Sequence, residues 1–149
     1  MKRLLTLLLL CCCTPAQAEV TRHVASGALR FERVGEERGE PQQVIKLAGK
    51  IDLVFNLSVL SDGKGHEYID GLSKPTNETD AKLHYAAYVA LFDEKKSLVA
   101  TLHSDDLFAH GVQRGENFTF SMRAILPAGR SRDIRSYQAV LFVSTEPLQ

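Results

Sequence analysis

Cysteine is almost absent from this sequence, and the little there is stands in one run near the start. The three cysteines are Cys11, Cys12 and Cys13, and all of them fall in a segment that we expect to be removed. The remaining chain then has no thiol that could act as a nucleophile, ligate a metal or form a disulfide. We therefore expect an apolar core, without cross-links, to hold the fold.

An excess of either charge is also missing. The chain has 18 Lys and Arg against 18 Asp and Glu, and loss of Lys2 and Arg3 with the leader leaves 16 against 18. Nucleic-acid-binding proteins need a basic surface that neutralises phosphates, and no block rich in Lys and Arg follows the leader. We expect no nucleic-acid partner. Four arginines do bunch around a predicted turn, where charged side chains are typical: Arg123, Arg130, Arg132 and Arg135.

No apolar run is long enough to span a membrane. The longest, Leu4 to Cys13, has about ten residues, against the roughly twenty that a transmembrane helix needs. It follows Lys2 and Arg3 and precedes Ala16-Gln17-Ala18, the pattern of a secretory signal peptide with a cleavage site before Glu19. Residues 1–18 are thus predicted to be a signal peptide. We expect a periplasmic or secreted protein without a permanent membrane anchor.

Residues 19–149 are predicted to form a single domain. Cleavage leaves 131 residues, enough for one core that buries roughly two-thirds of the surface exposed by the unfolded chain. The residues show no heptads, internal repeats or amphipathic helix.

Several segments have the alternating pattern of half-buried β-strands. Residues 45–59 place apolar side chains on one side of a period of two, in a run long enough to predict a bend near Gly49. A weaker signal at Leu29 and Phe31 indicates a first strand. Residues 83–92 are apolar on both faces, as in a central strand, and are followed by a hairpin turn at 93–96 and a strand from Leu98. Two more strands are predicted over residues 117–124, ending near Pro127, and 136–143.

The segment from Ser61 to Asp80 is predicted to be a long loop. It is rich in Gly, Asp, Ser, Lys, Asn and Pro, and long loops in compact domains often carry function. Within it, Tyr68, Ile69 and Leu72 form the predicted partner-binding group, since aromatic and apolar loop residues often serve as interface hot spots.

About seven short strands separated by turns predict an all-β fold. We expect a single antiparallel β-sandwich after the signal peptide, with a closed barrel as the alternative. Sequence patterns do not distinguish the two, because they do not show whether the sheet edges meet.

The second half of the chain resembles the bacterial immunoglobulin-like domains named for an F-x-L-Y-D signature. Val89-Ala90-Leu91-Phe92-Asp93 matches the signature, with Val89 in place of its Phe and Phe92 in place of its Tyr. A hairpin and Gly115-Glu116-Asn117-Phe118-Thr119-Phe120 follow. The resemblance implies an immunoglobulin-like sandwich outside the cytoplasm, used for binding or assembly, and it transfers no catalytic residue.

Motifs of catalysis and cofactor binding are missing. The sequence has no G-x-S-x-G, H-E-x-x-H, phosphate loop or dinucleotide fingerprint, so we expect neither an enzyme nor a cofactor. The weak metal candidates are His103, Asp105, Asp106 and His110, whose spacing has no local geometry that places both histidines on one ion. The carboxylates Asp62, Asp70, Glu78 and Asp80 do not follow the calcium-loop spacing.

Together these patterns predict a small exported, non-enzymatic β-sandwich that binds a protein partner in the cell envelope, in an accessory or assembly role. An exposed sheet edge or the 61–80 segment is the expected contact. The alternative is a periplasmic protein that binds a small ligand or a metal.

Overall fold

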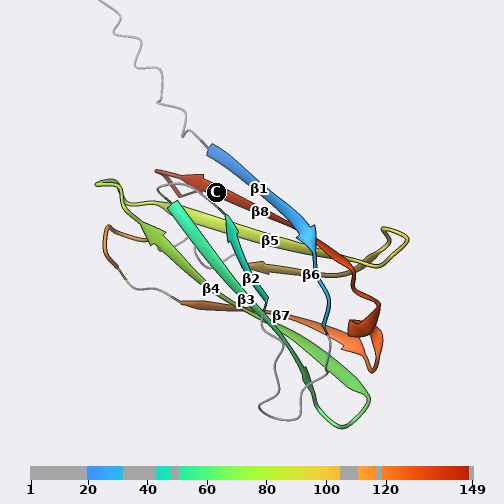
Figure 1. Ribbon diagram of the computed structural model, residues 1–149. Helices are drawn as coiled ribbons and strands as arrows, with labels where there is room; N and C mark the ends of the chain where they lie inside the picture. The colour runs from blue at the N-terminus through green and yellow to red at the C-terminus, as the bar shows by residue number, and fades with distance from the viewer. Residues whose placement is uncertain (1–19, 32–42, 48–50, 105–110, 117–118, 148–149) are drawn as a thin grey trace, which may run out of the picture.

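The computed structural model is an all-β sandwich of two four-stranded antiparallel sheets (Figure 1). It describes residues 20–31, 43–47, 51–104, 111–116 and 119–147. The first sheet, sheet A, has the order β1-β8-β5-β6, and the second, sheet B, has the order β2-β3-β4-β7. Within these ranges the chain forms eight strands: β1 (Val20–Ala28), β2 (Gln43–Leu47), β3 (Ile51–Ser61), β4 (His66–Asn77), β5 (His84–Phe92), β6 (Leu98–Ser104), β7 (Phe120–Pro127) and β8 (Ser136–Ser144).

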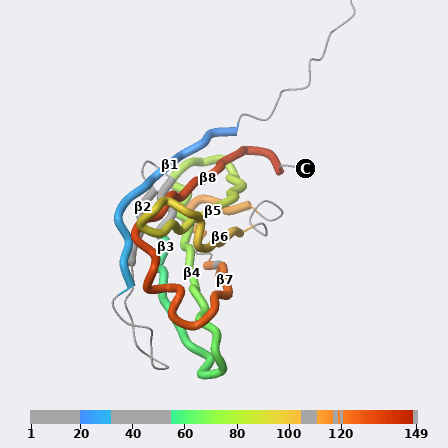
Figure 2. The backbone as a smooth tube through the Cα atoms, turned by 90° about the vertical axis from the view of Figure 1, so that its right-hand side faces the viewer, coloured from blue at the N-terminus to red at the C-terminus, as the bar shows by residue number. Residues whose placement is uncertain are grey.

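The two sheets lie against one another in the tube view (Figure 2). On one side of the sandwich β6 lies against β7, and on the other β1 is close to β2. The core between the sheets is made of inward-facing residues such as Phe55, Ile69, Tyr85 and Leu141, all fully buried. The structure thus confirms the β-sandwich, and two separate sheets take the place of the closed-barrel alternative.

The long strand predicted over residues 45–59 is two strands. β2 pairs with β3 in register Ile45 with Phe55 and Leu47 with Leu53. Both members of each pair have odd numbers, so the alternating pattern passes through the turn without a change of phase. The alternating pattern of apolar residues therefore does not show that the segment contains two paired strands. Gly49, where a bend was expected, lies outside the described residues.

The prediction of a loop from Ser61 to Asp80 was wrong. Its greater part is β4, an internal strand of twelve residues that pairs with β3 and β7. The inward side of β4 carries Ile69, but also Glu67, Gly71, Ser73 and Asn77, all of them buried. An apolar alternation never develops, because most of the buried positions on this strand are polar or lack a side chain.

The other predicted strands are placed close to their expected positions. β5, β6 and β8 are confirmed, including the hairpin turn at 93–96, and β7 ends at Pro127 as expected. The first strand lies earlier than predicted: β1 ends at Ala28, and Leu29 and Phe31 are buried just beyond it. The early strand was missed because its residues are mostly exposed and only weakly apolar.

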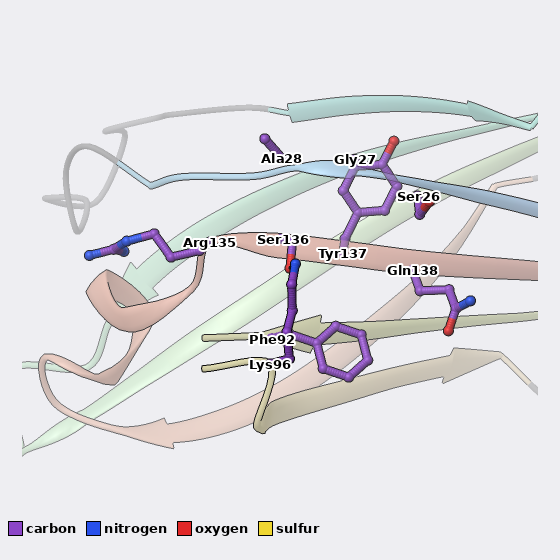
Figure 3. A pocket seen from close by; sticks show the side chains of 9 residues that line it. All are labelled: Ser26, Gly27, Ala28, Phe92, Lys96, Arg135, Ser136, Tyr137 and Gln138. Atoms are coloured by element: carbon purple, nitrogen blue, oxygen red, sulfur yellow. The ribbon is translucent and has the colours of Figure 1, made fainter. Parts of the chain in front are cut away.

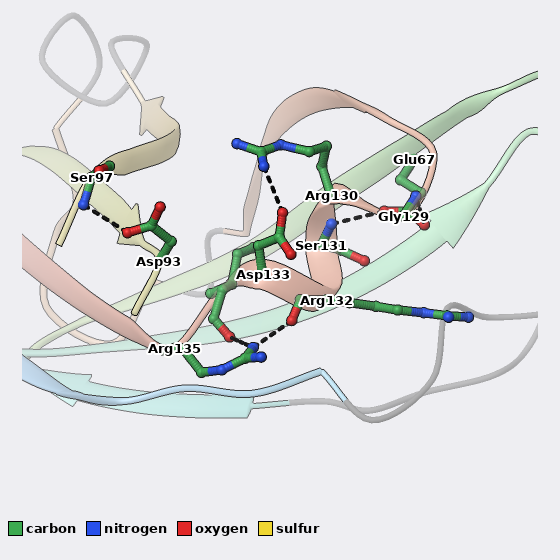
Figure 4. Close-up of polar contacts among 10 residues, drawn as sticks. Glu67, Asp93, Ser97, Gly129, Arg130, Ser131, Arg132, Asp133 and Arg135 are labelled. Carbon is green, nitrogen blue, oxygen red and sulfur yellow. Dashed lines mark hydrogen bonds and ion pairs between the residues drawn. The ribbon is translucent and has the colours of Figure 1, made fainter. Parts of the chain in front are cut away.

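A buried carboxylate fixes the crossing from sheet B to sheet A. β7 connects to β8 through a short 3-10 turn, η1 (Arg130–Asp133). Glu67 of β4 is only 3% exposed, and its two oxygens accept the backbone N–H groups of Gly129 at 2.7 Å and Ser131 at 2.9 Å (Figure 4). Burial acts to raise the pKa of Glu67, but the N–H groups of Ser131 and Gly129 outweigh it, so this pKa lies below its ordinary value. The charged form of Glu67 therefore stabilises the turn.

The order of the strands differs from that of constant-type immunoglobulin domains, whose sheets have the orders ABED and CFG. Sandwiches that share this architecture do not all share its topology. The immunoglobulin-like relation therefore rests on the sequence resemblance alone.

Candidate functional site

The three residues predicted to bind a partner lie on β4 and split between its two faces. Ile69 is 0% exposed and belongs to the core, so it is not part of any surface in this structure. Tyr68 and Leu72 point the other way, onto the outer face of sheet B. Successive side chains of a strand point to opposite faces of the sheet, so Ile69 and its neighbour Tyr68 cannot share one surface, as they could in a loop.

On this outer face Tyr68 and its neighbour Asp70 meet an arginine from a distant part of the chain. Asp70 stands opposite Arg123 of β7 in the β4–β7 register. Arg123 donates from Nε to Oδ1 of Asp70 at 2.6 Å and from Nη2 to Oδ2 at 2.9 Å. Its guanidinium carbon lies 5.4 Å from the centre of the Tyr68 ring. The hydrogen bonds that Arg123 donates to Asp70 raise the pKa of Arg123, which is charged in any case.

Two exposed apolar side chains flank this charged group. Leu72 of β4 is 49% exposed, and Ile125 of β7, opposite Tyr68, is 64% exposed. A hollow of about 460 Å³ opens beside Leu72 and is also lined by Ser58, Asp70, Ser121 and Arg123. We call Tyr68, Asp70, Leu72, Arg123 and Ile125 the β4–β7 patch.

The sequence indicated only two of the five residues of the β4–β7 patch as partner-binding. Tyr68 and Leu72 were predicted, whereas Arg123 had been grouped with the arginines of the following turn. Arg123 instead lies within β7, and only Arg130 and Arg132 of that group belong to η1. Asp70 and Arg123 are 53 residues apart, so only strand pairing brings them together.

A second hollow, of about 530 Å³, lies at one end of sheet A (Figure 3). Its wall includes two cationic side chains. Lys96 donates to Oγ of Ser136 at 3.2 Å, and the Arg135 guanidinium donates to the backbone carbonyls of Arg132 and Ile134. A ring from β8, Tyr137, lies across β1 at Gly27, where an added Cβ would be 3.0 Å from the ring. The hollow is lined by Ser26, Gly27, Ala28, Phe92, Lys96, Arg135, Ser136, Tyr137 and Gln138.

The metal candidates are described only in part. Asp105, Asp106 and His110 lie outside the described residues. His103 is on β6, on the outer face of sheet A, where its ring stacks on Tyr88 with centroids 6.3 Å apart. Within the described ranges, no three His, Cys, Asp or Glu side chains gather in a way that would hold a metal ion.

The acidic residues of the 61–80 segment are held separately. Asp62 closes the β3–β4 turn, accepting the N–H groups of Lys64 at 2.7 Å and His66 at 3.1 Å, and the bond from Lys64 is the main cause that lowers its pKa. Asp70 bonds Arg123, while Asp80 pairs with Arg114 at 2.6 Å. These carboxylates therefore act in local structure.

Comparison with known proteins adds little to this geometry. No protein-family model matches the chain, and no curated protein matches it. Among solved structures, the chain is similar to the infectious bursal disease virus VP2 subviral particle, with a TM-score of 0.43 and 14% identity, over 90% of this chain and 29% of that one. The structure of the infectious bursal disease virus Gx strain gives a TM-score of 0.37 and 14% identity, over 89% and 29%. The chain spans less than a third of these viral chains, and likenesses this distant carry no argument about function.

Proposed function

We propose that this protein is an exported, non-enzymatic β-sandwich that binds a protein partner in the cell envelope through the β4–β7 patch. The observation that carries the proposal is the set of Arg123, Asp70 and Tyr68 held in one geometry between two exposed apolar side chains.

The composition of the patch fits a protein surface. Tyr and Arg are enriched among the residues that dominate binding energy at protein interfaces, and apolar residues surround them in the buried centre. The bidentate bond to Asp70 holds the Arg123 guanidinium in place before binding. Less side-chain entropy is then lost when a partner docks.

Export and the immunoglobulin-like relation belong to the same proposal. The leader predicts a periplasmic or secreted protein, and the resemblance around Phe92-Asp93 implies a module used for binding or assembly. No cysteine follows the leader, so the exported chain would be held together by its apolar core without disulfides.

A small ligand in the hollow of sheet A is the second candidate. Its volume of about 530 Å³ lies within the usual range of ligand pockets. Lys96 and Arg135, together with the hydroxyls of Ser26 and Ser136, would favour an anionic ligand.

The test is purification of the tagged protein from its native cell envelope, with mass spectrometry of whatever remains bound. Leu72→Glu and Ile125→Glu place a charge on the patch and should weaken a specific partner at least about tenfold, or about 1.4 kcal/mol. The matched control is Leu98→Glu on sheet A, where the leucine is similarly exposed at 58%. If the partner is lost equally from all three variants, or is retained by all, the patch is not its site. Recovery of the protein alone would put the small-ligand function first.

A further inference from the structure

The first strand leaves one edge of sheet A open. β1 pairs with β8 along all nine of its residues, from Val20 opposite Ser144 to Ala28 opposite Ser136. Among the described residues no strand pairs with its other edge, which forms the upper border of sheet A in Figure 1. The predicted cleavage before Glu19 leaves a single residue ahead of this strand.

The pairing with β8 also shows which backbone groups this edge presents. The N–H of Leu29 donates to the carbonyl of Arg135 at 3.0 Å, which continues the β1–β8 register by one residue. Backbone groups in an antiparallel pair alternate, so the odd-numbered residues of β1 bond β8. The even-numbered residues point their N–H and C=O groups outward: Val20, Arg22, Val24, Ser26 and Ala28.

This edge lacks the usual features that prevent strand pairing. β1 has no proline and no register shift against β8, and Arg22 is its one Lys, Arg, Asp or Glu. By contrast, the edge strand β7 carries Arg123 and Pro127, and β2 carries Lys46. β6 is also uncharged, but it is shorter and has a register shift against its partner β5. Charge, proline and irregularity are the features that commonly block sheet edges.

We propose that β1 pairs antiparallel with β1 of a second copy of this chain, around a twofold axis at Val24, to form a homodimer with a continuous eight-stranded sheet. In this register Val24 stands opposite Val24 of the partner subunit. Arg22 stands opposite Ser26 of the partner subunit, and Val20 opposite Ala28 of the partner subunit. Every outward backbone group of one strand then meets an outward group of the other.

The side chains favour this register over its neighbours. Val24 is 49% exposed, so a self-contact at the axis buries apolar surface on both copies. A slide of two residues places Arg22 opposite Val24 of the partner subunit and pairs only four of the five outward residues. A slide of four residues centres the axis on Arg22 and places the two guanidinium groups directly opposite, which is destabilising. Shifts in either direction also leave residues at the strand ends unpaired. The number of paired residues therefore selects the register centred on Val24, and charge repulsion disfavours the one centred on Arg22.

Disulfide trapping tests the register directly. In a hydrogen-bonded antiparallel pair, opposite Cα atoms are about 5.5 Å apart, within the range that a disulfide spans. Val24→Cys should therefore oxidise to a covalent dimer in a chain whose leader cysteines have been removed by processing or changed to serine. The matched control is Val20→Cys, at a valine of similar exposure on the same face. The two Val20 positions would be eight residues apart along the strand, about 26 Å, and should not cross-link.

Proline substitutions test the backbone pairing. Val24→Pro removes an outward N–H and leaves the bonds to β8 intact, as edge-strand prolines do. It should weaken dimerisation at least tenfold by sedimentation equilibrium and change the thermal unfolding midpoint little. Ala25→Pro removes a bond to β8 and should lower the midpoint clearly.

Three results would overturn the proposal. These are a wild-type chain that stays monomeric at all concentrations measured, equal cross-linking of Val20→Cys and Val24→Cys, or a Val24→Pro variant that folds and dimerises like wild type. Should Val24→Pro fail to fold, the cysteine pair decides alone. The β4–β7 patch lies on the other sheet, so the partner-binding function and the homodimer can each fail without the other.

Discussion

The two strands β4 and β5 occupy the same third position in the stacked sheets, yet they build the core in opposite ways. β5 buries large apolar side chains such as Tyr85, Val89 and Leu91. β4 buries Gly71 and Ser73, and a Cβ added at Gly71 would lie 3.1 Å from Leu57 and 3.4 Å from Leu102 of β6. The small residue on β4 thus makes room for large side chains of both sheets, so the core at this point depends on the neighbours of β4 as much as on β4 itself.

Removing a large side chain from β5 should have the largest effect. Leu91→Ala deletes a fully buried side chain and should lower the free energy of unfolding by about 2–5 kcal/mol, from lost burial and the cavity left behind. Urea denaturation measures it. Leu98→Ala, at an exposed leucine of β6, should change stability by less than about 0.5 kcal/mol. Equal losses in the two variants would mean that β5 does not supply the core.

The polar side of β4 should respond to loss of a charge. Glu67→Gln keeps the shape but removes the carboxylate that accepts the two N–H groups of η1, at an expected cost of about 1.5–3 kcal/mol per charged hydrogen bond. The pKa of Glu67 is lowered on folding, so its contribution is complete above the ordinary value of 4.5 and is lost as the pH falls through the lower folded value.

Denaturation at neutral and at acidic pH checks this assignment. The difference between wild type and Glu67→Gln should shrink as the pH falls below about 4.5. Glu146→Gln, on an exposed glutamate near the end of the described chain, serves as the control and should show little difference at either pH. If the difference in unfolding free energy between wild type and Glu67→Gln is the same at both pH values, the charge of Glu67 does not stabilise η1.

Filling the space above Gly71 on β4 tests how closely the neighbouring side chains pack around it. Gly71→Val should overpack the core and cost about 1–3 kcal/mol. Because Leu102 is one of the side chains in contact, combining Gly71→Val with Leu102→Ala should cost less than the sum of the single changes. A double-mutant cycle measures this coupling, and strict additivity would argue against the complementary fit.

The smallest effect is expected at the Tyr85 hydroxyl, a buried group for which the structure shows no hydrogen-bond partner. Tyr85→Phe removes this polar atom from the core and should leave stability unchanged or raise it by up to about 1 kcal/mol. Thermal unfolding is the measurement, with Tyr88→Phe on the outer face as the control. A clear loss of stability would show that the hydroxyl is bonded in solution.

For the candidate site, the sequence identified single residues but not the residues that lie beside them in the fold. Tyr68 and Leu72 were predicted for a partner surface, and both lie on the outer face of sheet B. Ile69 was wrongly grouped with them, since strand geometry turns it into the core. Arg123 and Ile125 were missed because nothing local in the sequence relates β7 to β4.

The sequence by itself determined the elements whose own residues carry a signal. Alternating or continuous apolar residues located β5, β6 and β8, and turn residues marked the 93–96 hairpin and the end of β7. Only the tertiary structure decided that residues 66–77 are a strand, because the large side chains that fill the space beside Gly71 come from β3, β6 and β7. The same holds for Arg123 and Asp70, whose contact depends on strand pairing across 53 residues. A local sequence pattern reflects the side chains that a segment itself buries. The burial of β4 depends instead on the large side chains that neighbouring strands pack against it.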